Sequence, residues 1–216
     1  TSNATRQDVG VAVVDDFLSV GAKSVETIAN TIFPAGLYYR YGAPAFFDVF
    51  RDRVLAKVRR NERWSGYYFE RMMQLPVSGS EPRNQLWNIV ERIRNEQVRA
   101  LNKFELSLFD PLRDVDNSPY GGQCLSFLSF KVVPGTPRLL TLTAQYRNHF
   151  YIEKLLGNLI GLGRLMSFVA RETQLHVGPL TVISTHAEID QPNGARRSDI
   201  TAMIGRFDQA RQPLAA

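Results

Sequence analysis

Two stretches of the chain, Cys124-Leu-Ser-Phe-Leu-Ser-Phe-Lys-Val-Val133 and Leu139-Leu-Thr-Leu-Thr-Ala-Gln-Tyr146, are rich in strand-forming residues. Between them lies Pro134-Gly-Thr-Pro137, which combines residues typical of tight turns. We therefore predict a β-hairpin. If its turn is centred between Gly135 and Thr136, the residue that faces Cys124 across the ladder is Arg147.

The predicted pairing of Cys124 with Arg147 suggests that the cysteine is an activated nucleophile. Directly opposed residues have β-carbons roughly 5 Å apart, so the guanidinium would stabilise a thiolate and make the sulfur nucleophilic near neutral pH. A register slip or a bulge would break this correspondence. The alternative is that Cys124, in an apolar strand, is a small buried hydrophobic residue. Because it is the single cysteine of the chain, an intramolecular disulfide and a cysteine-clustered metal site are excluded.

Upstream of the hairpin, the periodicity favours helices. Apolar residues spaced four apart from Phe46 to Val58 alternate with basic residues and predict an amphipathic core helix. A second helix is expected to begin after Asn84, as its N-cap, and to run towards Arg99. The segment from Trp64 to Met73 mixes aromatic and charged residues without a clean period, so we predict turn and strand there.

The composition describes an ordinary globular protein. With 216 residues and 44% hydrophobic content, we expect a single domain over residues 5–216, while residues 1–4 resemble an expression-vector remnant. No apolar run approaches the ~20 residues that cross a bilayer, and we expect a cytoplasmic protein with no membrane partner. The net charge of +5 suggests that the protein binds a phosphate-bearing ligand or nucleic acid. The basic residues are dispersed along the chain, which argues against nucleic-acid binding. The three histidines lack metal-ligand spacing, so no metal site is predicted.

The segment from Gln145 to Asp190 resembles the thymidylate synthase family. That family carries a nucleophilic cysteine at a strand start, then Gln-Arg-Ser-x-Asp after the next strand, an asparagine eleven residues beyond the arginine, an apolar helix, Val-Gly and His-x-Tyr. The matching residues here are, in order, Cys124, Tyr-Arg-Asn-His-Phe150, Asn158, Leu159 to Ala170, Val177-Gly178 and Thr-His-Ala-Glu188. From Arg147 to Gly178 the match runs without a gap. The resemblance is clear over roughly residues 120–190.

The resemblance implies a role for each matching residue. Cys124 would add to C6 of a pyrimidine, and Asn158 would bind the base edge through an amide that donates and accepts. The other implied assignments are phosphate contacts by Arg147 and Asn148, sugar contacts by His186 and Glu188, an active-site tyrosine at Tyr68, and phosphate contacts by Arg99 and Lys103 across a subunit interface. Ordinary core packing for Tyr68, and ordinary solvated charges for Arg99 and Lys103, are the alternatives.

The implied fold is α/β (α+β), a mixed twisted sheet flanked by helices, in a homodimer formed by sheet stacking. The implied activity is transfer of a methyl or hydroxymethyl group to C5 of a pyrimidine nucleoside monophosphate, with 5,10-methylenetetrahydrofolate as donor. By resemblance, Asn158 favours a uracil-type base such as that of dUMP. Methylation and hydroxymethylation both stay open.

Several positions depart from the family pattern. Leu125 stands where the family has a histidine, Phe150 replaces an aspartate, and Glu188 replaces the sugar-binding tyrosine. For the family's helix with a proton-transfer glutamate, Glu26 is a weak substitute. These departures leave a second hypothesis, a nucleotide-binding or regulatory module with reduced catalysis. A third, nucleic-acid binding, would need a clustered basic face.

Overall fold

The computed structural model describes residues 2–58, 66–77, 80–95, 99–111, 114–115 and 122–211. Its centre is a mixed sheet in the order β3-β4-β5-β7, formed by Phe104–Ser107, Leu125–Val133, Leu139–Tyr146 and His176–Ser184. Both β3 and β5 pair antiparallel with β4, while β5 and β7 are parallel. Parallel neighbours require a crossover, which here includes helix α7, Leu155–Glu172. The predicted mixed sheet is confirmed.

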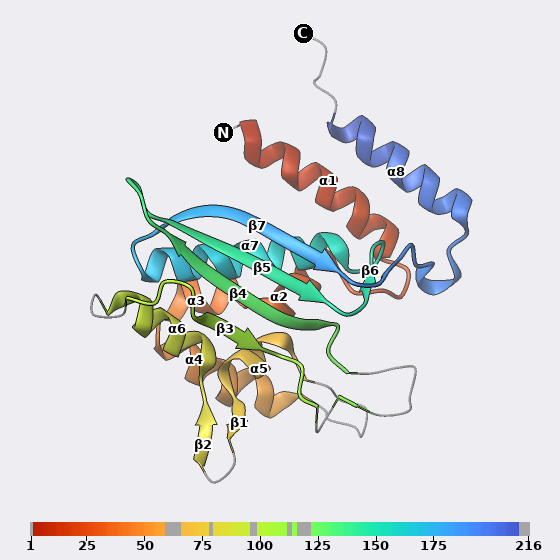
Figure 1. Cartoon of the computed structure of the whole chain (residues 1–216). Helices are drawn as coiled ribbons and strands as arrows, with labels where there is room; N and C mark the ends of the chain where they lie inside the picture. Colours follow the sequence, from red (N-terminus) through yellow and green to blue (C-terminus); the bar gives the residue numbers. More distant parts are fainter. Residues whose placement is uncertain are drawn as a thin grey trace.

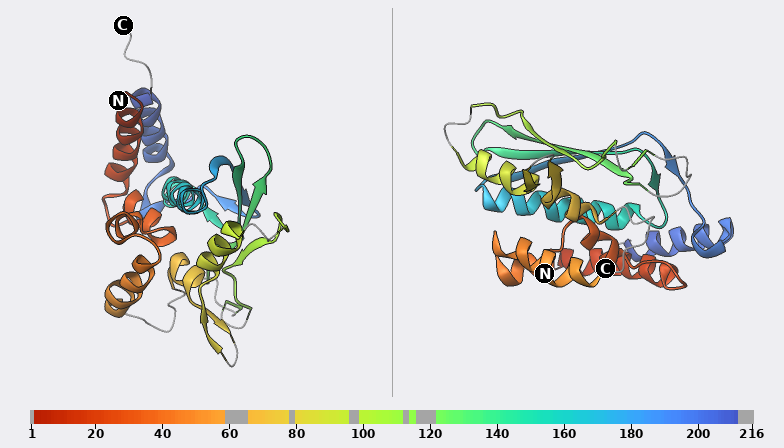
Figure 2. Two further views of the ribbon diagram at one scale, coloured as in Figure 1. Left: turned by 90° about the vertical axis from the view of Figure 1, so that its left-hand side faces the viewer. Right: turned by 90° about the horizontal axis from the view of Figure 1, so that it is seen from below.

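The helices gather on one side of this sheet (Figures 1 and 2). Along β5, Leu140, Leu142, Ala144 and Tyr146 are fully buried, as alternation in a one-sided sheet requires. On the other face of β7, Val177 and Ile183 are 54% and 47% exposed. The sheet therefore has one covered face and one open face. No helix of the described part of the chain is long and apolar enough to cross a membrane.

The remaining elements have the following bounds. Helices are α1 Ser2–Leu18, α2 Val25–Ile32, α3 Ala35–Tyr41, α4 Ala45–Val49, α5 Tyr68–Met73, α6 Gln85–Arg94 and α8 Arg197–Arg211. Strands are β1 Leu75–Val77 and β2 Ser80–Arg83, which pair with each other, and β6 His149–Phe150 and β8 Ala187–Glu188, which also pair. Helices α1 and α8 lie side by side at the edge of the molecule (Figure 1), where Val14, Leu18, Val25 and Met203 form a second small core.

The predicted hairpin is confirmed, but its register differs from the prediction. Val133 pairs with Leu139 and Leu128 with Ala144, so the ladder is centred on Thr136 rather than between Gly135 and Thr136. The register shifts again between Leu125 and Phe127. Because one residue more is accommodated on β4, Leu125 and Leu128 are both buried although three apart. This bulge at Ser126 restores the predicted neighbours, since Arg147 N donates to Cys124 O over 2.8 Å.

The helix predictions are confirmed in part. Asn84 caps α6, its Oδ1 accepting from Trp87 N at 2.9 Å, but the helix ends at Arg94 because Asn95 has extended backbone (φ −77°, ψ 105°). Arg99 therefore lies outside it. The helical segment from Ala45 to Lys57 contains a π-helical turn at Phe50–Val54. That turn breaks the four-residue period, so Leu55 rather than Val54 is buried.

The prediction of turn and strand from Trp64 to Met73 is wrong for its described part, which forms α5. Phe69, Met72 and Met73 are buried at helical spacing, and the Glu70 carboxylate accepts from the Tyr67 backbone N–H at 3.3 Å. The Phe69 ring meets the rings of Phe33 and Phe46 at centroid distances of 5.8 and 5.6 Å. This aromatic packing fixes α5 and with it the neighbouring Tyr68. Residues 64–65 lie outside the described part.

Helices α2 and α7 approach each other closely because two glycines lie between them. A β-carbon on Gly157 would lie 2.6 Å from Ile28 Cβ, and one on Gly161 would lie 2.8 Å from the Ala29 carbonyl oxygen. Only glycine permits this spacing without displacing α2. The contact sets the position of Asn158, in the first turn of α7, relative to α2.

Candidate active site

A cavity of about 200 Å³ lies at one end of the sheet, where Cys124 precedes β4. It brings together residues from α2, the start of α5, the segment before β4, the β6 turn and α7. The lining residues are Lys23, Ile28, Thr31, Gly66, Tyr67, Tyr68, Gly122, Gln123, Cys124, Asn148, His149, Phe150, Lys154 and Asn158. We call it the Cys124 cavity. Of the residues singled out from the sequence, it contains Cys124, Tyr68, Asn148 and Asn158.

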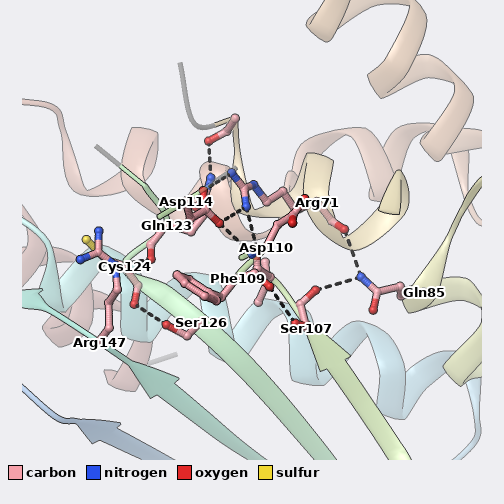
Figure 3. Close-up of polar contacts among 12 residues, drawn as sticks. Arg71, Gln85, Ser107, Phe109, Asp110, Asp114, Gln123, Cys124, Ser126 and Arg147 are labelled. Atoms are coloured by element: carbon pink, nitrogen blue, oxygen red, sulfur yellow. Dashed lines mark hydrogen bonds and ion pairs between the residues drawn. The ribbon is translucent and has the colours of Figure 1, made fainter. Parts of the chain in front are cut away.

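The Cys124 thiol is half-buried between a phenol and a guanidinium. Tyr68 makes a side-chain hydrogen bond with it, and the Arg147 guanidinium lies beside the sulfur (Figure 3). Burial raises the pKa of the Cys124 thiol, although the charges of Arg147 and Lys154 and the Tyr68 hydrogen bond act in the opposite direction. The charge of Arg147 does lower the thiol pKa, as expected, but the expectation that this would make the sulfur nucleophilic near neutral pH is corrected, because desolvation outweighs it and the net pKa is raised. Burial likewise raises the pKa of Tyr68, so its hydroxyl stays protonated.

Two features position the Arg147 guanidinium. Its Nε donates to the Gln123 carbonyl oxygen at 2.9 Å. Gly122 has a φ of +69°, and a β-carbon there would lie 3.0 Å from the terminal guanidinium nitrogen. A side chain at residue 122 would thus be strained and would displace Arg147. This glycine provides the space that Arg147 occupies.

A buried ion pair between Arg71 and Asp114 lies next to the segment that precedes Cys124 (Figure 3). Arg71 and Asp114 have side-chain exposures of 5% and 1%, and Arg71 donates to Asp114 Oδ1 at 2.7 Å and to the Leu108 carbonyl at 2.8 Å. Asp114 also accepts from Asp110 N at 2.8 Å. Nearby, the Gln123 amide donates to the Gly66 carbonyl at 2.9 Å, which ties the residue before Cys124 to the segment that leads into α5. We call Arg71, Asp114 and these contacts the charged network.

A second buried group of polar side chains lies on the α7 side. Asn158 Nδ2 and His149 Nε2 are 3.0 Å apart, and His149 Nδ1 and Ser184 Oγ are 2.9 Å apart. The His149 ring stacks on Tyr146 with a centroid distance of 4.1 Å and an interplanar angle of 7°. Burial lowers the pKa of His149, which favours the neutral ring. We call His149, Asn158 and Ser184 the neutral network.

His149 is the residue that the sequence reasoning missed, since it considered that histidine only as a metal ligand. Lys154, which lines the cavity four residues before Asn158, was missed as well, although its helical spacing from Asn158 is a signal that could have found it. In the described part of the chain, no group of three histidine, cysteine or carboxylate side chains could hold a metal ion.

The proposed sugar residues lie beside the cavity rather than on its wall. His186 Nδ1 donates to Asn148 Oδ1 at 2.8 Å, so it reaches the cavity through Asn148. Glu188 is exposed in β8, opposite Phe150 of β6. A ligand would have to extend out of the Cys124 cavity to touch it.

Arg99 and Lys103 lie at the opposite end of α7. Arg99 lines a separate cavity of about 920 Å³ together with Arg92, Arg94 and Arg138, next to Glu172. The carbonyl of Lys103 accepts from Arg92 at 2.9 Å. The 18 residues of α7 span about 27 Å, so these two side chains are remote from Cys124 of the same chain. Their role as contacts from a second subunit stays a prediction.

The chain is similar to a known protein over most of its length. No protein-family model matches the chain. Over 185 residues, which cover 79% of this chain and 77% of the relative, the sequence is 26% identical to a Methanothermobacter marburgensis protein described as "Putative thymidylate synthase". The relative therefore carries the same family name as the resemblance in residues 120–190, and the similarity extends over more of the chain.

Proposed function

We propose that the Cys124 cavity binds a pyrimidine nucleoside monophosphate similar to dUMP, and that the Cys124 sulfur adds to C6 of its ring. The observation that supports this most directly is the convergence of a thiol, a phenol and a primary amide on the wall of one cavity, from Cys124, Tyr68 and Asn158, with the Arg147 guanidinium beside the sulfur. These are the groups needed for covalent addition, base recognition and phosphate binding.

The proposed addition activates C5 of the ring. When the thiolate attacks C6, the electron pair of the C5–C6 double bond moves to C5 and the C4 carbonyl oxygen as an enolate. C5 then takes up an electrophile, either a solvent proton or a one-carbon unit. Loss of the original C5 proton and expulsion of the sulfur restore the double bond. Tyr68, Arg147 and Lys154 favour the thiolate required for the first step.

The proposed phosphate site is centred on Arg147, whose planar fork suits a phosphate dianion. Asn148 and Lys154, both on the cavity wall, would add a hydrogen bond and a second positive charge. His186 and Glu188 are proposed to contact the sugar hydroxyl from beside the cavity. Asn158 is proposed to bind the base.

The residues present do not fit methylenetetrahydrofolate well. The described lining of the Cys124 cavity includes no carboxylate to accept from the pterin N–H groups, and Phe150 stands at the aspartate position. Glu26 lies in an adjacent cavity of about 520 Å³, but its carboxylate accepts from Arg164 at 2.9 and 2.7 Å. The reaction class that we propose is C5 methyl or hydroxymethyl transfer, and no step is given to folate.

A homodimer is proposed on the open face of the sheet. Val177 and Ile183 would be covered there by a second copy. In this proposal Arg99 and Lys103 of that copy reach the phosphate bound beside Arg147.

The test is tritium release from 5-tritiated dUMP, with dCMP in parallel, with and without methylenetetrahydrofolate. We expect tritium release without any one-carbon donor, because addition at C6 and proton exchange at C5 require only the thiol and water. We expect no release from Cys124→Ser. A dependence on the folate would assign it as the donor. Absence of release despite dUMP binding would overturn the covalent mechanism.

The second candidate function is a nucleotide-binding module without turnover. The raised pKa of the buried Cys124 thiol favours it, because a protonated thiol is a poor nucleophile. It predicts dUMP binding that is the same in Cys124→Ser and in the unsubstituted protein.

A further inference from the structure

The amide of Asn158 has two chemically opposite ends, and one contact distinguishes them. Nδ2 lies 3.0 Å from His149 Nε2, whereas Oδ1 has no hydrogen-bond partner in the described part of the chain. Asn158 is only 3% exposed, and both residues line the Cys124 cavity. The oxygen and the second N–H of Asn158 are therefore available to a bound base.

His149 is itself held in place. Its ring is 2% exposed, is stacked on Tyr146, and has Nδ1 2.9 Å from Ser184 Oγ at the end of β7. In the neutral ring one nitrogen donates and the other accepts. With Asn158 Nδ2 donating to Nε2, the proton is on Nδ1 and is donated to Ser184. In this arrangement the acceptor nitrogen of His149 faces the Asn158 N–H group, so the orientations of the ring and of the amide are set together.

The backbone that carries Asn158 is equally constrained. Gly157, the preceding residue, is wedged against Ile28 of α2, where a β-carbon would come within 2.6 Å. The backbone at Asn158 is therefore fixed and its side chain is only 3% exposed, so rotation of the amide about its last bond is the motion that matters most for a bound base. A contact that fixes this rotation determines what the cavity presents.

Uracil and cytosine differ in the property that this rotation controls. Uracil offers an N3–H donor next to an O4 acceptor, whereas cytosine offers an N3 acceptor next to an N4 amino donor. An amide in one orientation is complementary to one base and opposes the other with donor against donor and acceptor against acceptor. A site with buried polar groups left unpaired rejects the wrong ligand strongly.

We propose that His149 is a specificity-determining positioning residue, which holds the Asn158 amide in the orientation that accepts a uracil base and rejects a cytosine base. The inference rests on the proposed nucleotide binding. It adds a residue to which the family resemblance assigns no role, and it locates the choice of base in the contact between β6 and α7.

The experiment measures dissociation constants for dUMP and dCMP by calorimetry in the unsubstituted protein and two variants. His149→Phe keeps a flat ring on Tyr146 but removes both nitrogens. His149→Gln loses the ring but retains an oxygen that can accept from Asn158. We expect preference for dUMP in the unsubstituted protein, a loss of that preference of about tenfold or more in His149→Phe, and retention in His149→Gln.

A purely structural role predicts the reverse, with His149→Phe tolerated and His149→Gln weakened for both nucleotides alike. The double-mutant cycle with Asn158→Ala provides a second readout. In that background His149→Phe should not change the ratio of the two dissociation constants, because the amide is gone. An equal effect in both backgrounds would overturn the proposal.

The outcomes also separate this inference from the proposed function. If the unsubstituted protein binds neither nucleotide, the proposed function and the inference fail together. If it binds dUMP selectively and His149→Phe leaves the ratio unchanged, only the inference fails. Selective binding of dCMP by the unsubstituted protein would overturn the assigned orientation.

Discussion

Two buried polar networks meet at the Cys124 cavity, and they differ in charge. The charged network behind β4 contains the ion pair of Arg71 and Asp114, while the neutral network beside α7 consists of His149, Asn158 and Ser184. Removing one partner from a buried ion pair leaves an uncompensated charge, which is costly. Removing one member of a neutral network costs less and changes what the remaining members present. We infer that the charged network maintains the shape of the site and the neutral network its selectivity.

The strongest test of this contrast is Asp114→Ala. It leaves the Arg71 guanidinium buried without its carboxylate, so we expect a loss of about 3–5 kcal/mol in the free energy of unfolding. Urea denaturation measures it. The matched control is Asp16→Ala, which breaks the exposed pair of Asp16 and Arg206, separated by 3.0 Å, and should cost about 0–1 kcal/mol. Equal losses would contradict the role given to the charged network.

Gly122→Ala should have the next largest effect. The positive φ disfavours alanine by about 1–2 kcal/mol, and the added methyl group pushes the Arg147 guanidinium away. We expect dUMP binding to weaken as well as stability to fall, as measured by calorimetry and denaturation. Gly163→Ala is the control, since a β-carbon there meets nothing within 4 Å and should stabilise α7 by about 0.5–1 kcal/mol. Unchanged nucleotide affinity in Gly122→Ala would argue against Arg147 as the phosphate ligand.

A third prediction concerns the thiol between the two networks. Because burial raises the pKa of Cys124, the pH profile of its alkylation by iodoacetamide should have its midpoint above the usual value of about 8.5. Tyr68→Phe removes a hydrogen bond that lowers this pKa, so the midpoint should move higher still. Substituting the exposed Tyr39 by phenylalanine should leave the profile unchanged. A midpoint below that of a free cysteine would contradict the desolvation argument.

The smallest expected effect is the pH dependence of stability contributed by His149. Its folded-state pKa is lowered, so below the unfolded value of about 6.5 the unfolded chain binds more protons than the folded one. This residue therefore reduces the free energy of unfolding as the pH falls below about 6.5, and its contribution is constant above that value. Denaturation of the unsubstituted protein and of His149→Gln between pH 5 and 8 isolates it. Parallel profiles would show that His149 does not titrate in this range.

Features that depend on a few neighbouring residues, such as a turn or a helix cap, could be predicted from the sequence. The turn residues between β4 and β5 and the Asn84 cap gave the hairpin and the start of α6 correctly. The neighbouring positions of Cys124 and Arg147 were also predicted, but through a symmetric turn, whereas a shifted register and a bulge at Ser126 produce them. The shift of the turn centre and the bulge change the strand register in opposite directions, and strand propensity predicts neither of them.

The rest of the site depends on contacts between distant segments. Helix α5 was missed because Phe69 is stabilised by rings of Phe33 and Phe46, which lie far away in the chain. The pairing of His149 with Asn158 requires β6, α7 and the end of β7 to meet. The residue pattern within each of these segments does not indicate that they pack together in the fold, so the neutral network could not be predicted.

The glycine contact between α2 and α7 has a mechanical consequence. Where Gly157 and Gly161 bring the two helices together, the wall that carries Ile28, Thr31 and Asn158 is already at its steric limit and acts as a rigid stop. Induced fit around a ligand must therefore be one-sided. Adjustment to a ligand then has to come from the other lining residues, among them Tyr67, the N-cap of α5, and Tyr68, its first residue, so a tightly bound inhibitor should gain its residence time from movement of that helix end.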